Sequence, residues 1–108
     1  MANSQTMNTQ NLIDADGNPA GGGVDACGLT ISWQNGPLGR GAERQTPNGV
    51  FVETVIAAAL QRIQFYNEGK FRCRENSLAI THLEEALHWL HARTAAREAR
   101  EVEGINVV

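Results

Sequence analysis

The sequence predicts an α+β fold, in which a small N-terminal antiparallel β-sheet packs with a C-terminal antiparallel two-helix hairpin. Two observations predict it. Apolar and polar residues alternate from Leu29 to Gln34, as in a half-buried strand, and the turn residues 35–37 follow. From Val50 the apolar period changes to that of an amphipathic helix, and it recurs in a second segment.

The chain of 108 residues is the size of one small domain, preceded by an arm. Residues 1–21 are expected to be this mobile arm, or to become ordered only against a partner subunit, because they carry few apolar side chains. The single domain then covers residues 22–108. Its strand region is 22–49 and its helical hairpin is 50–103. An edge strand is expected at residues 21–24, where the arm meets the domain.

The hairpin follows from two apolar stripes. The first helix is expected over residues 50–67 and ends at Gly69, a residue that tolerates the left-handed conformation. The second begins at Cys73 or Asn76, ends near Glu103 and is about 40 Å long. The stripes consist of Val52, Val55, Ile56, Ala59, Leu60 and Ile63, and of Ile80, Leu83, Leu87 and Leu90, which extend to Asn76, Thr94 and Arg97.

Two helices and one or two strands give a thin hydrophobic core for this length. A second copy of the chain would complete the apolar stripes, and the 3-4 spacing of the second helix suits a helix–helix seam. The sequence therefore predicts a homo-oligomer.

Charge and composition argue against several classes of protein. The net charge is −3, and residues 1–39 contain no Lys or Arg, which argues against sequence-independent binding to DNA or RNA. No apolar run approaches the roughly 20 residues that span a membrane. Two cysteines are too few for a disulfide scaffold, so a reduced, cytosolic protein is expected.

The histidines offer one catalytic alternative. Glu84, His88 and His91 recur at i, i+4 and i+7, so they could bind one metal ion from a single helix face. A solvated or interfacial row explains them more simply, and no nucleophile motif or phosphate loop is present. We therefore expect neither a metal, nor a cofactor, nor a catalytic site.

A basic row near the C-terminus has two interpretations. Arg93, Arg97 and Arg100 recur on one helix face, where like charges repel. They could simply interact with the negative end of the helix dipole. Alternatively, an anion such as a nucleotide phosphate lies between arginines from several subunits.

A second cluster surrounds the bend of the hairpin. In one interpretation, Phe65 and Phe71 close the open end of the hairpin while Asn76 caps the second helix. In the other, an aromatic ring stacks on a base and the Asn76 amide reads its edge. Asn76 and Arg93 lie about 25 Å apart on one helix, so one small nucleotide cannot bridge them. The cluster consists of Phe65, Tyr66, Asn67, Phe71, Arg72, Arg74, Glu75 and Asn76.

Four segments carry a family resemblance that covers about residues 22–106. They are ISWQNGP at 31–37, CREN at 73–76, HLEEALHWL at 82–90 and ARTAAREAREVEG at 92–104. The chain resembles the phage-encoded Thoeris anti-defence sponges, and its hairpin is similar to that of the anti-CBASS cyclic-oligonucleotide sponge. The resemblance implies a homo-oligomer, a dimer or hexamer, in the cytoplasm of an infected bacterium. It would capture cyclic nucleotide messengers of bacterial immunity without degrading them.

The resemblance also implies two ligand sites. A cyclic ADP-ribose isomer would contact Tyr66 and Asn76, with Phe65 beside them and Arg40 or Arg44 on the phosphates. Tyr66 replaces a family Phe and keeps the stacking surface. A cyclic di- or trinucleotide of the CBASS pathway would contact Arg93, Thr94 and Arg97 at an oligomer axis.

Two other functions stay open at this point. A metal-dependent phosphodiesterase using Glu84, His88 and His91 would destroy the messenger. An oligomeric interaction protein would bind no small molecule, and its arginine row would serve only helix-dipole and salt-bridge interactions.

Overall fold

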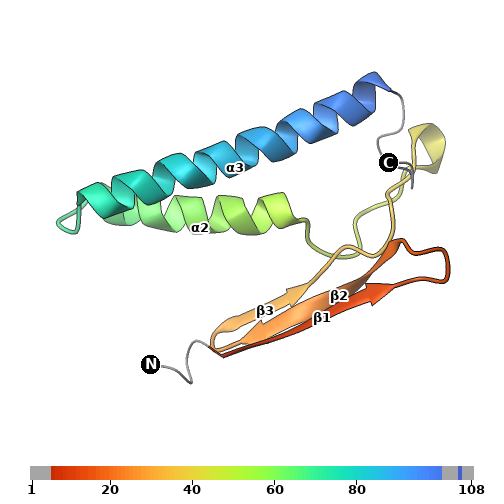
Figure 1. Cartoon of the computed structure of the whole chain (residues 1–108), viewed down its shortest axis with the longest axis horizontal. Coiled ribbons are helices and arrows are strands. Elements are labelled where there is room, and N and C mark those ends of the chain that lie inside the picture. The colour runs from red at the N-terminus through yellow and green to blue at the C-terminus, as the bar shows by residue number, and fades with distance from the viewer. Residues whose placement is uncertain (1–5, 101–104, 106–108) are drawn as a thin grey trace. The chain divides into compact units, whose positions relative to one another are not determined.

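A computed structural model describes residues 6–100 and 105, and it confirms the α+β class (Figure 1). The described chain divides into two compact units, of which the first comprises residues 6–51 with 105 and the second comprises 52–100. The first unit holds a three-stranded sheet and the second holds two helices. Homo-oligomerisation and the mobility of residues 1–21 stay predictions.

The sheet consists of β1 (Met7–Ile13), β2 (Pro19–Ala26) and β3 (Leu29–Ser32), which are antiparallel neighbours in chain order. The β1–β2 turn is built on Asp14, whose carboxylate accepts hydrogen bonds from the backbone N–H groups of Asp16 and Asn18. Both connections are short, so each strand pairs with the strand that follows it.

The structure corrects two expectations about the first residues. The sequence predicts the first strand at residues 21–24, as an edge strand, whereas β1 covers Met7–Ile13 and β2 is the central strand. β1 is exposed along its whole length, so no buried apolar side chain holds it in the sheet. It is held by main-chain hydrogen bonds to β2. At Gly22, where φ is 125°, a side chain would collide with the Gln10 carbonyl, so glycine allows β1 to approach.

The loop that follows β3 ends at Val50, which pairs with the residue directly after β3. β3 ends at Ser32, two residues earlier than predicted, and Val50 continues its pairing as a parallel bridge to Trp33. The Val50 N–H donates to the Ser32 carbonyl at 2.8 Å, and the Val50 carbonyl accepts from Gln34 at 3.0 Å. Because these groups are used in the sheet, the helix starts after Val50 and not at it.

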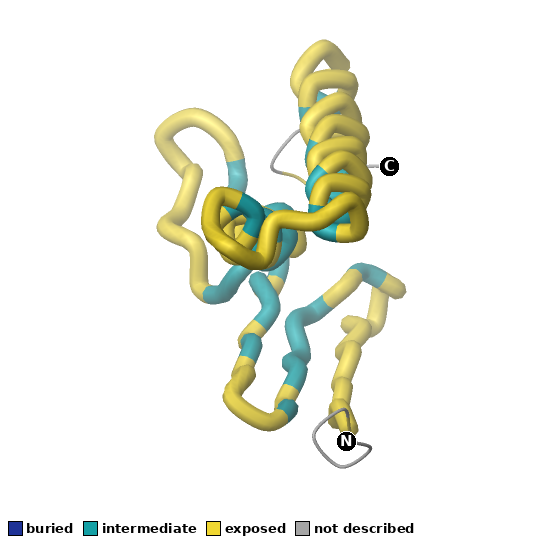
Figure 2. Tube along the Cα trace, turned by 90° about the vertical axis from the view of Figure 1, so that its left-hand side faces the viewer, coloured by how far each residue is buried: buried dark blue, intermediate teal, exposed yellow. Residues whose placement is uncertain are grey.

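The second unit is an antiparallel helical hairpin of α2 (Val52–Asn67) and α3 (Arg74–Ala99) (Figure 1). The predicted α3 stripe is confirmed, since each of its members is half-buried and half-buried residues recur along the helix (Figure 2). In α2, Val52 and Ala59 are exposed and the other predicted members are half-buried. α3 ends at Ala99, before the predicted end, and residues 101–103 lie outside the described residues.

No described residue is fully buried in the single chain (Figure 2). Large apolar side chains are instead exposed, and Trp89 on α3 is 69% exposed. The single chain therefore has as little hydrophobic core as the sequence predicts. In the described part of the chain, neither helix is long and apolar enough to cross a membrane.

Candidate functional site

The bend between α2 and α3 is held by side-chain hydrogen bonds. The Asn67 carbonyl oxygen accepts from the Cys73 N–H at 3.1 Å, and the Asn67 amide donates to the Ser77 hydroxyl at 3.1 Å. Asn67 therefore joins the last residue of α2 to the first turn of α3. The helix ends where expected but for another reason, since the φ of Gly69 is not positive.

Cys73, not Asn76, is the N-cap of α3. Its Sγ accepts the Asn76 N–H at 3.4 Å, and its extended backbone precedes the helix. The capping role considered for Asn76 is therefore wrong. The Asn76 side chain instead donates to the Phe71 carbonyl at 3.0 Å, which fixes the backbone of the link.

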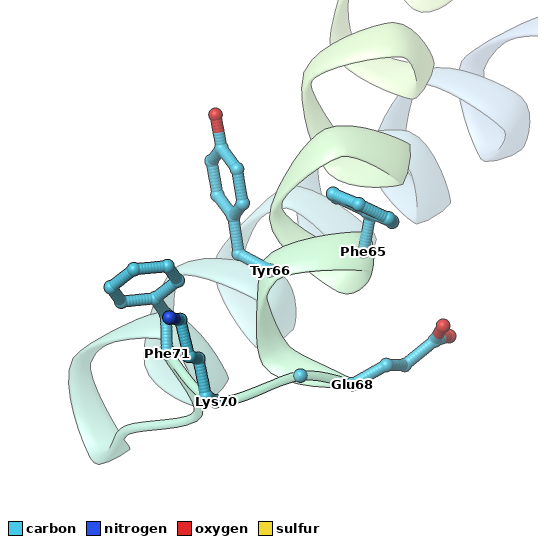
Figure 3. Close-up of a pocket in the computed structure, with 6 residues that line it drawn as sticks. Phe65, Tyr66, Glu68, Lys70 and Phe71 are labelled. Carbon is cyan, nitrogen blue, oxygen red and sulfur yellow. The ribbon is translucent and has the colours of Figure 1, made fainter.

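The bend carries a pocket of about 360 Å³, within the usual size range of small-molecule sites. Tyr66, Phe71 and Lys70 extend from the same side of the bend, while Glu68 extends away from them (Figure 3). Phe65 and Phe71 are 54% and 67% exposed, so they do not close the end of the hairpin in this chain. The lining residues are Phe65, Tyr66, Glu68, Gly69, Lys70 and Phe71.

Cations lie over all three aromatic rings of this pocket. The Arg62 guanidinium carbon is 5.0 Å from the centre of the Phe65 ring and 4.9 Å from that of Tyr66. The Lys70 ammonium is 5.6 Å from the centre of the Phe71 ring. Such exposed cation–ring contacts contribute about 0.5–1 kcal/mol each. The pocket thus combines flat apolar surfaces with positive charge.

Only part of this site is predicted by the sequence. Tyr66 and Phe65 line the pocket, whereas Asn76 lies at the same bend but is not among the lining residues. Arg62 and Lys70 are not among the predicted site residues. The i, i+3 and i+4 spacing from Arg62 to Phe65 and Tyr66 could have identified Arg62, because residues at these spacings meet on a helix surface.

The loop arginines belong to the other unit. Arg40 and Arg44 flank the short 3₁₀-helix η1 (Gly41–Glu43), and Arg44 donates to the Gly39 carbonyl at 3.5 Å. A hydrogen-bonded pair formed by Asn35 and Asn48 closes the base of this loop, through contacts of 2.8 and 3.0 Å. The assignment of Arg40 or Arg44 to the ligand of the bend stays a prediction.

The second predicted site lies near the far end of α3. Arg93 is exposed, while Thr94 and Arg97 are half-buried. The Thr94 hydroxyl donates to the Leu90 carbonyl at 3.2 Å, so this side chain lies against its own helix. α3 is continuous from Arg74 to Ala99, and its rise places Arg93 about 25 Å from Asn76.

The geometry does not support the metal alternative. Within residues 6–100 and 105, no three His, Cys, Asp or Glu side chains are grouped so that they could hold a metal ion. The His88 ring contacts Trp89 edge-on with centroids 5.3 Å apart, and His82 lies 3.9 Å from Glu85. In the described chain, Glu84, His88 and His91 are therefore not brought together as a metal-binding group.

Comparison with known proteins identifies the hairpin. Residues 26–95 match the family described as Acb2/Tad1, hairpin domain, so the match includes β3, α2 and most of α3. The protein "Thoeris anti-defense 1" of Bacillus phage SBSphiJ7 is 48% identical over 75 residues, which cover 69% of this chain. The match covers 50% of that relative, so the chain spans about half its length. With the family match extending over more than half of its residues, the chain belongs to the Acb2/Tad1 hairpin-domain family.

Proposed function

We propose that this protein counters bacterial immunity by binding and sequestering a cyclic nucleotide messenger without degrading it. The family match and the phage relative that is named for Thoeris anti-defence support this role. The protein would act in the cytoplasm of the infected bacterium. Its first ligand would be a cyclic ADP-ribose isomer.

The observation that carries the proposal is the exposed aromatic pocket at the bend. Tyr66 and Phe71 present rings that are 40% and 67% exposed, with cations over them. A nucleotide offers the complementary surfaces, since its base stacks on a ring and its phosphates attract cations. Tyr66 would stack the base, Phe65 would support that ring, and Asn76 would hold the link and meet the edge of the base.

Two further elements belong to the proposal. Arg40 or Arg44 would pair with the phosphates of the ligand at the bend. Arg93, Thr94 and Arg97 would bind a cyclic di- or trinucleotide between subunits of a homo-oligomer, such as a hexamer. The 25 Å between Asn76 and Arg93 supports two separate sites on one chain.

A capture experiment tests the function. The purified protein is incubated with the product of an active TIR-domain enzyme, freed of small molecules and heat-denatured, and the released compounds are analysed by mass spectrometry. Recovery of the intact cyclic messenger is expected. A messenger left free and unchanged would contradict the proposal for this ligand, and a cleaved product would indicate a phosphodiesterase.

Tyr66→Ala is the matched variant for this experiment. Loss of one stacking ring removes about 1–3 kcal/mol, so the affinity should fall about 5- to 150-fold. Isothermal titration measures the affinity, and analytical ultracentrifugation checks that the oligomeric state is unchanged. Loss of the oligomer would instead assign Tyr66 to an interface. Phe51→Ala is the control, because Phe51 is an exposed aromatic residue outside the pocket.

A further inference from the structure

Arg62 is not a lining residue of the pocket, but it contacts two of the rings that line it. Its guanidinium lies 5.0 and 4.9 Å from the ring centres of Phe65 and Tyr66, and these two rings are 6.0 Å apart. Its Nε donates a hydrogen bond to the Tyr66 hydroxyl at 3.2 Å. One side chain therefore contacts both rings and fixes the polar end of one of them.

The remaining donors of Arg62 are available to a ligand. The Nε atom is used by Tyr66, whereas the two terminal nitrogens carry four more N–H groups. Among the residues that the structure describes, neither terminal nitrogen has a hydrogen-bond or ion-pair partner. A guanidinium is always charged at neutral pH, and its flat fork matches phosphate oxygens.

Lys70 adds a second cation, over the third ring of the pocket. Its ammonium lies over the Phe71 ring and forms no ion pair with any acidic residue in the described part of the chain. Two cations that form no ion pair in the described chain therefore lie at the rings of the pocket, Arg62 from α2 and Lys70 from the link to α3, while the lining residue Glu68 extends away from Tyr66, Phe71 and Lys70 (Figure 3). A negatively charged ligand would be attracted more strongly than an uncharged one.

We infer that Arg62 is a specificity-determining residue of the pocket, which contacts a phosphate of the bound nucleotide and orients the Tyr66 ring for stacking. This inference rests on the proposed function, and it assigns part of the phosphate recognition to the hairpin itself. The hydrogen bond from Nε sets the position of the ring. The terminal nitrogens then meet the phosphate beside the stacked base.

Four variants separate these two contributions. Arg62→Met removes the charge and the hydrogen bond but keeps an extended apolar side chain. Arg62→Lys keeps the charge and loses the flat fork. Tyr66→Phe keeps both rings and removes only the hydroxyl group. Arg72→Met is the matched control, since it removes a charge from the same end of the hairpin and Arg72 contacts no pocket ring in the described chain.

Titration calorimetry with a cyclic ADP-ribose isomer made by a TIR-domain enzyme, at low and high salt, provides the readout. Arg62→Met should weaken binding about 10-fold or more and reduce its dependence on salt, because screening acts on the charge that was removed. Arg62→Lys should keep the salt dependence with a smaller loss. Tyr66→Phe should weaken binding a few-fold, and it should have no additional effect on the Arg62→Met background, because the hydrogen bond is already absent there.

The outcomes distinguish the inference from the function. Equal losses in Arg62→Met and Arg72→Met would contradict a specific role of Arg62, as would an unchanged salt dependence in Arg62→Met. Additive effects of Arg62→Met and Tyr66→Phe would contradict the orienting role. If the wild-type protein binds the isomer and Arg62→Met binds it equally well, the inference alone is wrong. If the wild-type protein does not bind it, the proposed function fails together with the inference.

Discussion

The two units of this protein obtain their structure in different ways. In the sheet, β1 has seven exposed residues and is held by main-chain pairing to a glycine-rich β2. In the hairpin, side chains determine nearly everything, since apolar stripes define the packed faces and asparagine side chains define the bend. The comparison teaches that side-chain periodicity locates an element well only where side chains stabilise it.

The largest expected effect is in the sheet. Gly22→Val should destabilise it by about 2 kcal/mol or more, because valine is strained at positive φ and its Cβ would collide with the Gln10 carbonyl. Urea unfolding followed by hydrogen exchange of the β1 amides measures the loss. Gly17→Asn is the control, since Gly17 has positive φ with open space around it and asparagine tolerates this conformation. Equal losses in both variants would show that the collision is not the cause.

A smaller effect is expected in the hairpin. Leu87→Ala should cost about 1–2 kcal/mol, which is less than for a fully buried leucine because Leu87 is only half-buried. Thermal unfolding monitored by circular dichroism at 222 nm checks this value. A cost close to zero would remove Leu87 from the packed face.

Trp89→Ala tests whether an exposed side chain of α3 contributes to the stability of the hairpin. In an isolated chain its effect should stay within about 0.5 kcal/mol, because surface substitutions are usually mild. In the predicted homo-oligomer, a copy that covers Trp89 would make the loss much larger and dependent on protein concentration. Unfolding at two protein concentrations, together with sedimentation, distinguishes these cases.

The smallest expected effect is at the start of α3. Cys73→Ser should stabilise the chain by about 0.5 kcal/mol, because a serine hydroxyl is a better acceptor for the Asn76 N–H than a thiol. Cys73→Ala should destabilise it, since the N–H loses its side-chain acceptor. The same thermal unfolding measures both variants, and a loss of stability in Cys73→Ser would contradict the capping role.

Much of the candidate site could be predicted from the sequence. The residue Lys70 could not, for a physical reason. Tyr66 and Phe65 were found because aromatic residues stand out next to the end of a helical stripe. Lys70 was missed because a lone lysine in a link carries no pattern. Its position over the Phe71 ring depends on how the link folds, and the Asn76 hydrogen bond to the Phe71 carbonyl helps to fix that link.

The sequence by itself determined the helical hairpin, the half-buried stripe from Ile80 to Leu90 and the separation of Arg93 from Asn76, because helix period and rise are fixed by backbone geometry. Only the tertiary structure decided that β1 exists and that Cys73 caps α3. It also brought the Lys70 ammonium over the Phe71 ring. Main-chain pairing and contacts across a turn leave no periodic trace in the order of residues, so they are visible only once the chain has folded.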